Sequence, residues 1–393
     1  MTTPTIPFGL RARASNPGRQ LPSPLTPFVT STLARADAAL AEPFVGITTD
    51  GHLEPGLFSL SETGVSTRPM KQAADAFLAS LARDARARAS FAVDDDAWQR
   101  WNNTHPFTMR HGVLLESLSA KQRERALELI QTSFSRRGFE TARDIMKLNE
   151  TIGEMTERWE EYGEWLYWLS IFGTPSLHEP WGWQIDGHHL NVNCLVLGDQ
   201  VVMTPMFMGS EPTYAPMGKY AGTRVFEAEE QAALALMRGL SDAQLSAAGV
   251  PAKEYSGVNE GRIQGGALRD NLQLGFAGLS AAILSPRQQN QLLELIDVYV
   301  GRMRAGHDRV RMAEIRQQLE RTHLAWVGGI ADDSTFYYRI HSPVLLIEFD
   351  HLRGIALDND EPARTHIHTV MRTPNGNDYG KDLLRQHYAR VAH

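Results

Sequence analysis

Between residues 191 and 203 the chain reads Asn191-Val192-Asn193-Cys194-Leu195-Val196-Leu197-Gly198-Asp199-Gln200-Val201-Val202-Met203. Two runs of mainly aliphatic residues flank the Gly198-Asp199 pair. A Gly-Asp pair between two such runs is typical of the tight turn that joins antiparallel strands. We therefore predict a β-hairpin with strands at 191–197 and 200–203.

Three segments further along the chain have the same character. Residues 336–340 and 344–349 are predicted to pair as strands around His341-Ser342-Pro343, and residues 366–372 to form another short strand. These strands are grouped and do not alternate with helices. That order favours an antiparallel sheet in an α+β fold over a doubly wound parallel sheet.

Helical patterns dominate the N-terminal half. A helix-start signal, Leu-Ser-x-x-Gln, occurs three times, beginning at Leu118, Leu240 and Leu284. The copies are unequally spaced and the helices after them do not match, so we interpret them as independent caps and not as an internal repeat. The other helices are expected at about 70–88, 140–156, 226–239, 307–321 and 381–392.

The whole pattern predicts one large α+β domain at residues 67–393, in which a helical N-terminal half packs on a mostly antiparallel sheet. Residues 1–66 are rich in Pro, Thr, Ser and Gly, and the prolines at the start of this segment disfavour helix. We expect this Pro-rich segment to be an arm that wraps the body or a partner subunit. It is therefore the candidate contact of a homo-oligomer.

The composition is that of an ordinary globular protein, with 42% hydrophobic and 22% charged residues. A net charge of −7 gives no basic face for nucleic acid. No run reaches the ~18 apolar residues of a membrane span, and residues 1–13 lack the apolar stretch of a signal peptide. The one cysteine, Cys194, is expected in the core, which suits a reducing compartment. We expect a cytoplasmic protein without nucleic-acid or membrane partners.

The histidines give the first indication of a site, because the chain has no glycine-rich nucleotide loop, no Gly-x-Ser-x-Gly and no His-Glu-x-x-His. If residues 366–372 form a strand, His366 and His368 lie on the same face. Two imidazoles in this arrangement can chelate one divalent ion. The alternative is a pair of histidines that are hydrogen-bonded within a polar patch.

A second polar face strengthens the metal hypothesis. Alternation along residues 187–196 places His189, Asn191 and Asn193 together, with apolar residues on the other face. His189 would then supply a third nitrogen, and the two amides would orient substrate or water. The alternative is a buried network of satisfied polar groups.

Glu348 stands in the most apolar run of the chain, residues 344–349. Carboxylates are rarely buried unless they are paired. Three roles are open to it: a metal ligand, a general base with a raised pKa, or a salt-bridge partner of Arg339 or Arg372.

Aromatic residues gather near the same segments. Trp181 and Trp183 lead directly into the adjacent histidines His188 and His189, so we expect at least one indole to line the pocket wall. Tyr338, together with the Arg339 guanidinium, is a candidate for recognising an anionic group.

Several long segments resemble the domain-of-unknown-function family 3500. They are Pro180–His189, Tyr337–Ile340, Leu346–Glu348, His366–Arg372 and Asp378–Leu384 with His387-Tyr388, together with Trp101-Asn102, Arg110, Gly112 and Ser119–Gly138 upstream. The resemblance implies that the Trp-Gly-Trp, His-His and His-x-His segments belong to one recurring domain, and it implies no activity. Met371 stands where such proteins often have an aromatic residue, which argues against a stacking role at that position.

The sequence thus leads to the hypothesis of a mononuclear metalloenzyme that acts on a small molecule. The expected metal ligands are His189, His366, His368 and Glu348. The expected catalytic groups are Glu348, Arg372 and His188. The expected substrate contacts are Trp181, Trp183, Asn191, Asn193, Tyr338 and Arg339. Iron, manganese or zinc would suit these ligands, with oxidation slightly favoured over zinc-dependent hydrolysis. The alternative is metal-free binding of an anionic metabolite.

Overall fold

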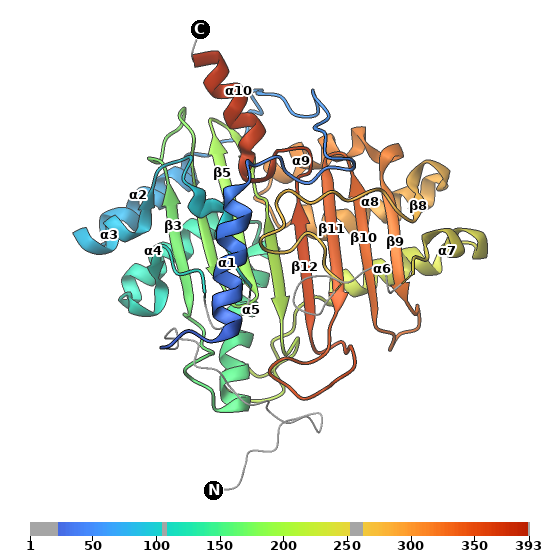
Figure 1. Cartoon of the computed structure of the whole chain (residues 1–393), viewed down its shortest axis with the longest axis horizontal. Helices are drawn as coiled ribbons and strands as arrows, with labels where there is room; N and C mark the ends of the chain where they lie inside the picture. The colour runs from blue at the N-terminus through green and yellow to red at the C-terminus, as the bar shows by residue number, and fades with distance from the viewer. Residues whose placement is uncertain (1–22, 104–107, 252–261, 392–393) are drawn as a thin grey trace, which may run out of the picture.

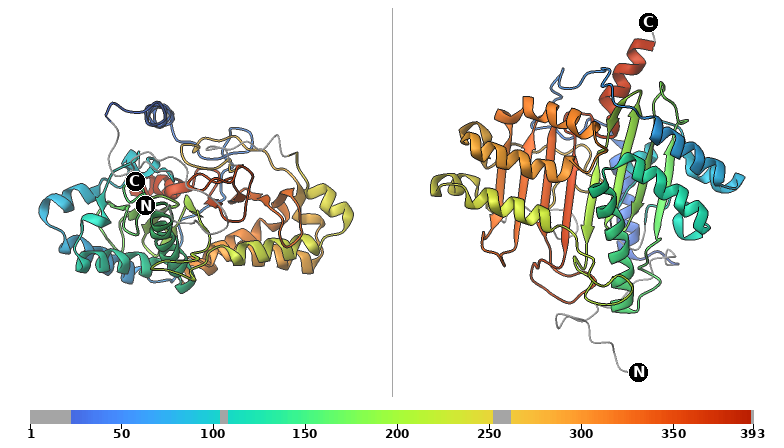
Figure 2. Two further views of the ribbon diagram at one scale, coloured as in Figure 1. Left: turned by 90° about the horizontal axis from the view of Figure 1, so that it is seen from below. Right: turned by 180° about the vertical axis from the view of Figure 1, so that it is seen from behind.

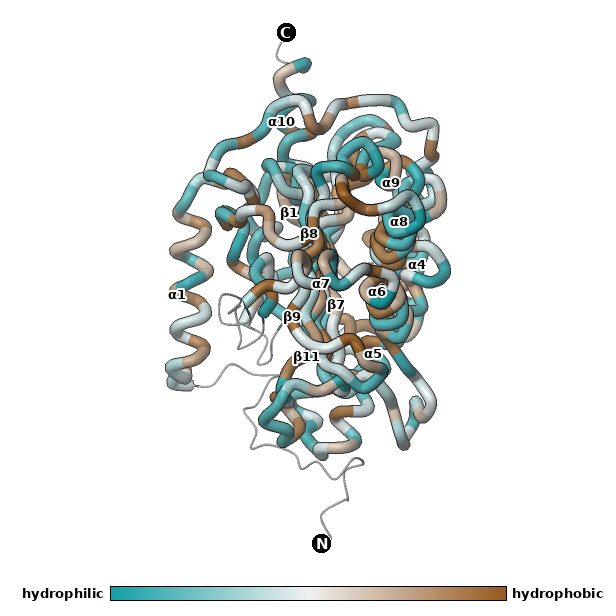
Figure 3. The backbone as a smooth tube through the Cα atoms, turned by 90° about the vertical axis from the view of Figure 1, so that its right-hand side faces the viewer, coloured by the Kyte–Doolittle hydropathy of each residue, from teal (hydrophilic) through white to brown (hydrophobic). Residues whose placement is uncertain are grey.

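The computed structural model describes residues 23–103, 108–251 and 262–391. A single broad sheet forms the middle of the molecule, with most helices on one face and irregular segments on the other (Figure 1). Seen edge-on, the helices α4, α5, α6 and α8 lie on one side of the sheet and α1 lies on the other (Figure 3). The prediction of a single α+β domain with a mostly antiparallel sheet is confirmed.

Twelve strands make up the sheet in the described residues. They are β1 (Ser90–Phe91), β2 (Val113–Leu114), β3 (Tyr167–Phe172), β4 (Trp181–Gly187), β5 (Leu190–Leu197), β6 (Gln200–Val202), β7 (Met206–Ser210), β8 (Leu279–Ser280), β9 (His323–Gly328), β10 (Phe336–Ser342), β11 (Leu345–His351) and β12 (Ile367–Arg372). Their order is β1-β3-β4-β5-β7-β12-β11-β10-β9-β8, with β2 paired to β3 and β6 to β5. Among these strand pairs in the described ranges only β1–β3 is parallel.

The α-helices of the described chain are α1 (Pro27–Ala41), α2 (Arg68–Ser80), α3 (Arg83–Ala89), α4 (Ala120–Ser133), α5 (Arg136–Thr156), α6 (Glu227–Arg238), α7 (Asp242–Ala248), α8 (Pro286–Val300), α9 (His307–Gln317) and α10 (Lys381–Val391). The single helix predicted at 70–88 is two helices, and α1 is a helix that we did not predict within the Pro-rich segment. Pro27 is its first residue, where the missing N–H costs nothing. No helix among the described residues is long and apolar enough to cross a membrane.

The two faces of the sheet differ in character. Alternate residues such as Trp183, Val192 and Ile347 enter the main apolar core, which also contains residues of the helices α2, α4, α5 and α8. The residues between them are polar, and Asn193 and Glu348 are buried there as well. They are covered by irregular segments, seen on the near face of the sheet in Figure 1 and opposite the helix layer in Figure 2. The polar face, and not the apolar core, therefore carries the candidate site.

The two halves of the sheet are built alike. A helix pair, a short strand (β2 or β8), a further helix pair and three successive antiparallel strands occur once before β7 and once more before β12, whereas β1 and β6 occur in the first half alone among the described residues. β7 and β12 pair with each other at the centre of the sheet. The two halves of the chain therefore have the same architecture.

Candidate metal centre

Three histidine side chains meet at one end of β7 and β12. The Nε2 atoms of His189 and His368 are 3.0 Å apart, those of His366 and His368 are 3.0 Å apart, and those of His189 and His366 are 3.3 Å apart. All three residues are buried. In the described ranges they form a group whose ligand atoms could hold a single metal ion. Their predicted convergence is confirmed as geometry.

The backbone places the three rings from two distant segments. His366 directly precedes β12 and His368 lies within it, so alternation puts both on one face, as predicted. His189 lies in the two-residue turn between β4 and β5, with a left-handed φ of 62°. Its position therefore comes from the turn and not from strand alternation, which was the reason for selecting it.

Gly209 makes room for the rings. The backbone N–H of Gly209 donates to the carbonyl of His189, which fixes the turn against β7. A Cβ at this position would lie 2.8 Å from the carbonyl oxygen of Ile367 in β12, 2.9 Å from Cδ2 of His368 and 3.0 Å from Cδ2 of His189. Only a residue without a side chain therefore fits between β12 and the two imidazoles.

The donor atoms suit a metal ion. Nδ1 of His366 lies 2.7 Å from the carbonyl oxygen of Arg353 and donates to it, so Nε2 carries a lone pair. Burial lowers the pKa of His368 well below its usual value, and the neighbouring His366 lowers it further. Neutral imidazole is the form that binds metals, at about 2.0–2.1 Å. Lone pairs that point at one another at 3.0 Å need a proton or a cation between them.

A second set of residues supports the ligands. The ring of His188 stacks on that of His189 with centroids 3.9 Å apart, and its Nδ1 lies 2.8 Å from Oδ1 of Asn149 in α5. Glu211 lies 3.9 Å from Nδ1 of His366 and accepts three backbone N–H bonds from residues 355–357. Sequence reasoning missed Asn149, Gly209 and Glu211, because no local pattern marks them.

Glu348 belongs to a different cluster. Its carboxylate accepts hydrogen bonds from the backbone N–H of Gln264 and Gly265 and from the hydroxyl of Tyr337, at 2.6–3.0 Å. It is not part of the three-histidine group. Within the described residues Glu348 therefore lies apart from the metal position, and the ion pairs of Arg372 are with Asp270 and Asp378. The irregular segment 262–270, called here the strap, supplies the backbone donors to Glu348.

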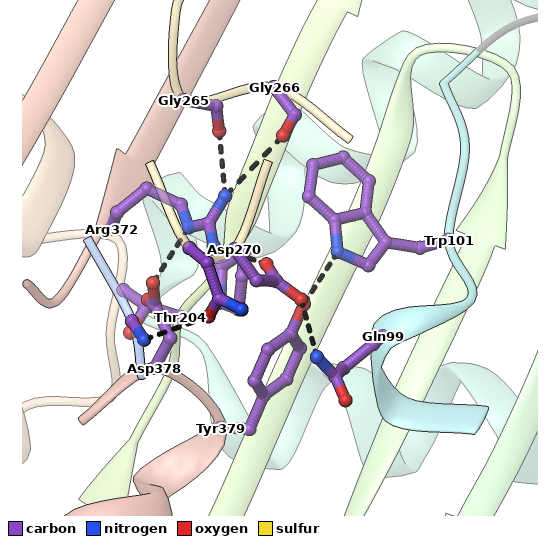
Figure 4. Close-up of polar contacts among 12 residues, drawn as sticks. Gln99, Trp101, Thr204, Gly265, Gly266, Asp270, Arg372, Asp378 and Tyr379 are labelled. Atoms are coloured by element: carbon purple, nitrogen blue, oxygen red, sulfur yellow. Dashed lines mark hydrogen bonds and ion pairs between the residues drawn. The ribbon is translucent and has the colours of Figure 1, made fainter. Parts of the chain in front are cut away.

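Arg372 holds the same strap from the next strand. Its guanidinium donates to Asp378 at 2.8 Å, to Asp270 at 2.5 Å and to the carbonyl of Gly265 at 2.8 Å (Figure 4). The hydroxyl of Tyr379 also donates to Asp270. Arg372 is thus fully engaged in a buried ionic network, and the structure does not place it beside the histidines.

The other predicted contacts are distributed between the two faces of the sheet. Trp181, Trp183 and Tyr338 lie in the main apolar core on the helix face and not against the three histidines. Their polar atoms bond to Ser176, Ser133 and Tyr299, respectively. They pack there because alternation puts them opposite the polar face.

On the polar face, Asn193 is held by Gln184 and Pro205. Arg339 donates to the carbonyl of Gly275. Asn191 is fully buried and pairs in register with Phe207, whose ring lies 5.0 Å from that of His368. Of the predicted substrate contacts, Asn191 is thus the one that the register brings close to the histidine group.

Fold and site together define a class: an α+β protein with a buried three-histidine group suited to one metal ion. The sequence profile of a family described as protein of unknown function, DUF3500, matches residues 63–381. The chain belongs to this family, as the resemblance implied. No curated protein and no solved structure shows significant similarity to it.

Proposed function

We propose that this protein is a mononuclear metalloenzyme that holds one divalent transition-metal ion through His189, His366 and His368 and acts on a small molecule. The observation that supports the proposal most strongly is the approach of three buried Nε2 atoms to within 3.3 Å of one another. Three protein ligands leave coordination positions for water or substrate, as in catalytic metal sites.

The chemistry of the donors bears on the metal and the reaction. Imidazole nitrogen suits zinc and iron, among other metals. When bound, such an ion polarises a substrate oxygen or lowers the pKa of a bound water to about 7. The preference for oxidation rested on a carboxylate ligand, but the oxygens of Glu348 are engaged by the strap. With nitrogen donors alone, the ligand set favours neither zinc-dependent hydrolysis nor metal-dependent oxidation.

Residues of the chain would orient the reaction partners. His188 and Asn149 fix the ring of His189 from behind. The ring of Phe207 offers an apolar wall beside His368. The Oδ1 atom of Asn191, next in register to Phe207, is a buried acceptor without a hydrogen-bond donor in the described part of the chain. It is the group that we expect to accept a hydrogen bond from substrate.

Metal content tests the proposal directly. Protein purified without a histidine tag is expected to contain about one divalent ion per chain by elemental analysis, and His366→Ala and His368→Ala should lose it. His387→Ala is the matched control, because this partly exposed histidine faces Glu179 and should keep the metal. Metal-free wild-type protein that also fails to take up Zn²⁺, Fe²⁺ or Mn²⁺ would leave the alternative, metal-free binding of an anionic metabolite.

A further inference from the structure

Two of the three helix-start signals occupy equivalent places in the fold. The capping box of Ser119 and Gln122 begins α4, and that of Ser285 and Gln288 begins α8. Each follows a short strand and a single 3₁₀ turn. The third signal, at Ser241, begins α7 and has no such setting. This shared setting argues against independent caps for the first two.

The segments around these two caps also match in sequence. The identical pairs are Gly112/Gly278, Leu118/Leu284, Ser119/Ser285, Gln122/Gln288, Leu127/Leu293, Glu128/Glu294, Leu129/Leu295 and Ile130/Ile296. Gly112 and Gly278 both have a φ near 90°, of 91° and 85°. A Cβ at Gly112 would press on the carbonyl of Leu169, and one at Gly278 on the carbonyl of Leu324. Each glycine therefore avoids a clash with a backbone carbonyl of the neighbouring strand, at equivalent places in the two halves.

The strand register repeats residue by residue. In the β4–β5 hairpin Trp183 pairs with Cys194 and Gln184 with Asn193. In the β10–β11 hairpin the same places hold Tyr338 with Phe349 and Arg339 with Glu348. The neighbouring strand also corresponds, because Ile171 pairs with Trp183 and Trp326 pairs with Tyr338.

The central pair fixes the relation between the halves. Met206 of β7 pairs with Met371 of β12. On their other sides Met206 pairs with Val192 and Met371 with Ile347, which are equivalent positions of the two hairpins. A twofold rotation about the Met206–Met371 pair therefore carries each half onto the other.

We infer that the chain is a tandem duplication, with its two copies in residues 68–210 and 227–372, and that the metal centre has an unused counterpart at the opposite end of the central strands. Register, and not counting along the chain, identifies this counterpart, because the first copy has one residue more between equivalent pairs: Val202 to Met206 corresponds to His368 to Met371. His368 pairs with Asp350, whose equivalent Leu195 pairs with Val202. His366 bonds to Leu352, whose equivalent Leu197 pairs with Gln200, so His366 corresponds to Gln200. His189 corresponds to Val344, because each is the second residue of the turn between equivalent strands.

The counterpart end serves a structural purpose in this chain. Gln200 accepts from the backbone N–H of Ser61 and donates to the carbonyl of Ser59, so it holds the Pro-rich segment against the sheet. A small cavity of about 30 Å³ lies beside this segment, and residues 200–204 form part of its lining. One end thus anchors the arm, while the other gathers three imidazoles. The metal centre draws His189 from the first copy and His366 and His368 from the second.

Grafting tests the equivalence. In the full chain, Gln200→His, Val202→His and Val344→His together should add a second Co²⁺ ion to the number that wild-type protein binds, measured by titration and elemental analysis. The control carries Val201→His, Met203→His and Leu345→His, the same substitutions shifted by one residue, and should add none. A folded graft that binds no more Co²⁺ than wild type would overturn the proposed counterpart.

Two outcomes keep this test separate from the proposed function, on which the graft rests. Wild-type protein that binds no Co²⁺, Zn²⁺, Fe²⁺ or Mn²⁺ refutes the proposed function. One ion more in the graft than in wild type, but not in the control, supports the counterpart whether or not wild-type protein binds metal. If Gln200→His releases the arm and the triple graft fails to fold, the test is repeated with the double variant Val202→His and Val344→His, which retains Gln200. That double variant should bind the extra Co²⁺ more weakly, and a folded double variant with no added ion would reject the counterpart site.

Discussion

Gly209→Ala changes the geometry of the metal centre without changing its ligands. The new methyl carbon would lie 2.8 Å from the carbonyl oxygen of Ile367 in β12, 2.9 Å from His368 and 3.0 Å from His189, where ordinary van der Waals contact begins near 3.4 Å. The two rings would have to move by roughly half an ångström, and metal–ligand distances tolerate only about 0.2 Å. We expect metal affinity to fall 10–100-fold, the usual effect of disturbing a ligand's support, which corresponds to about 1.4–2.8 kcal/mol.

Calorimetric titration with Zn²⁺ measures this loss, and thermal unfolding of the metal-free protein shows whether the fold survives. Gly275→Ala is the matched control, because a Cβ there meets nothing within 4 Å. Gly209→Ala with wild-type affinity would refute the reasoning, since the rings would then not be packed against β7. A loss of affinity equal in both variants would point to a general loosening and not to the ring contact.

Four further outcomes are expected. Asn149→Ala should weaken metal binding about 10-fold without removing it, because it releases only the supporting ring, whereas an unchanged affinity would exclude that role. Metal affinity should stay nearly constant from pH 8 down to the usual histidine pKa of about 6.5 and fall only at lower pH, because burial lowers the pKa of His368 and protons compete for its Nε2 only in acid; loss already at pH 7 would contradict this. Glu348→Gln should lower stability by roughly 1–3 kcal/mol and leave metal content unchanged, because the carboxylate bonds the strap, and a loss of metal at constant melting temperature would return it to the site. Arg372→Met should cost about 3–5 kcal/mol, because it leaves Asp378 buried without its cation, and a melting temperature equal to wild type would show that the network is dispensable.

Local pattern was enough for part of the site. Two-residue alternation correctly put His366 and His368 on one face. His189 also lies in the three-histidine group, but its place depends on a turn with a left-handed backbone, which alternation does not describe. Gly209 and Glu211 could not be found, because their role arises only when β7 pairs with β12 and brings together residues far apart in sequence.

The buried charges could also be predicted from the sequence only in part. A carboxylate inside an apolar strand must have partners, and Glu348 has them. They are the hydroxyl of Tyr337 and the backbone N–H groups of Gln264 and Gly265, and no sequence pattern reveals a backbone donor. The duplication was hidden for a related reason. A third, unrelated copy of the cap at Ser241 obscured the regular relation between Ser119 and Ser285.

The pairing of β7 with β12 has a consequence for how the protein reaches its native state. Strands so distant in sequence close a long loop, and such contacts form late because their entropic cost is high. His189 lies in the turn between β4 and β5, before β7 in the chain, whereas His366 and His368 lie at the start of β12. In rapid-mixing refolding experiments, the absorption of Co²⁺ bound to the three histidines should therefore rise only in the last kinetic phase. Metal binding would then report when folding is complete.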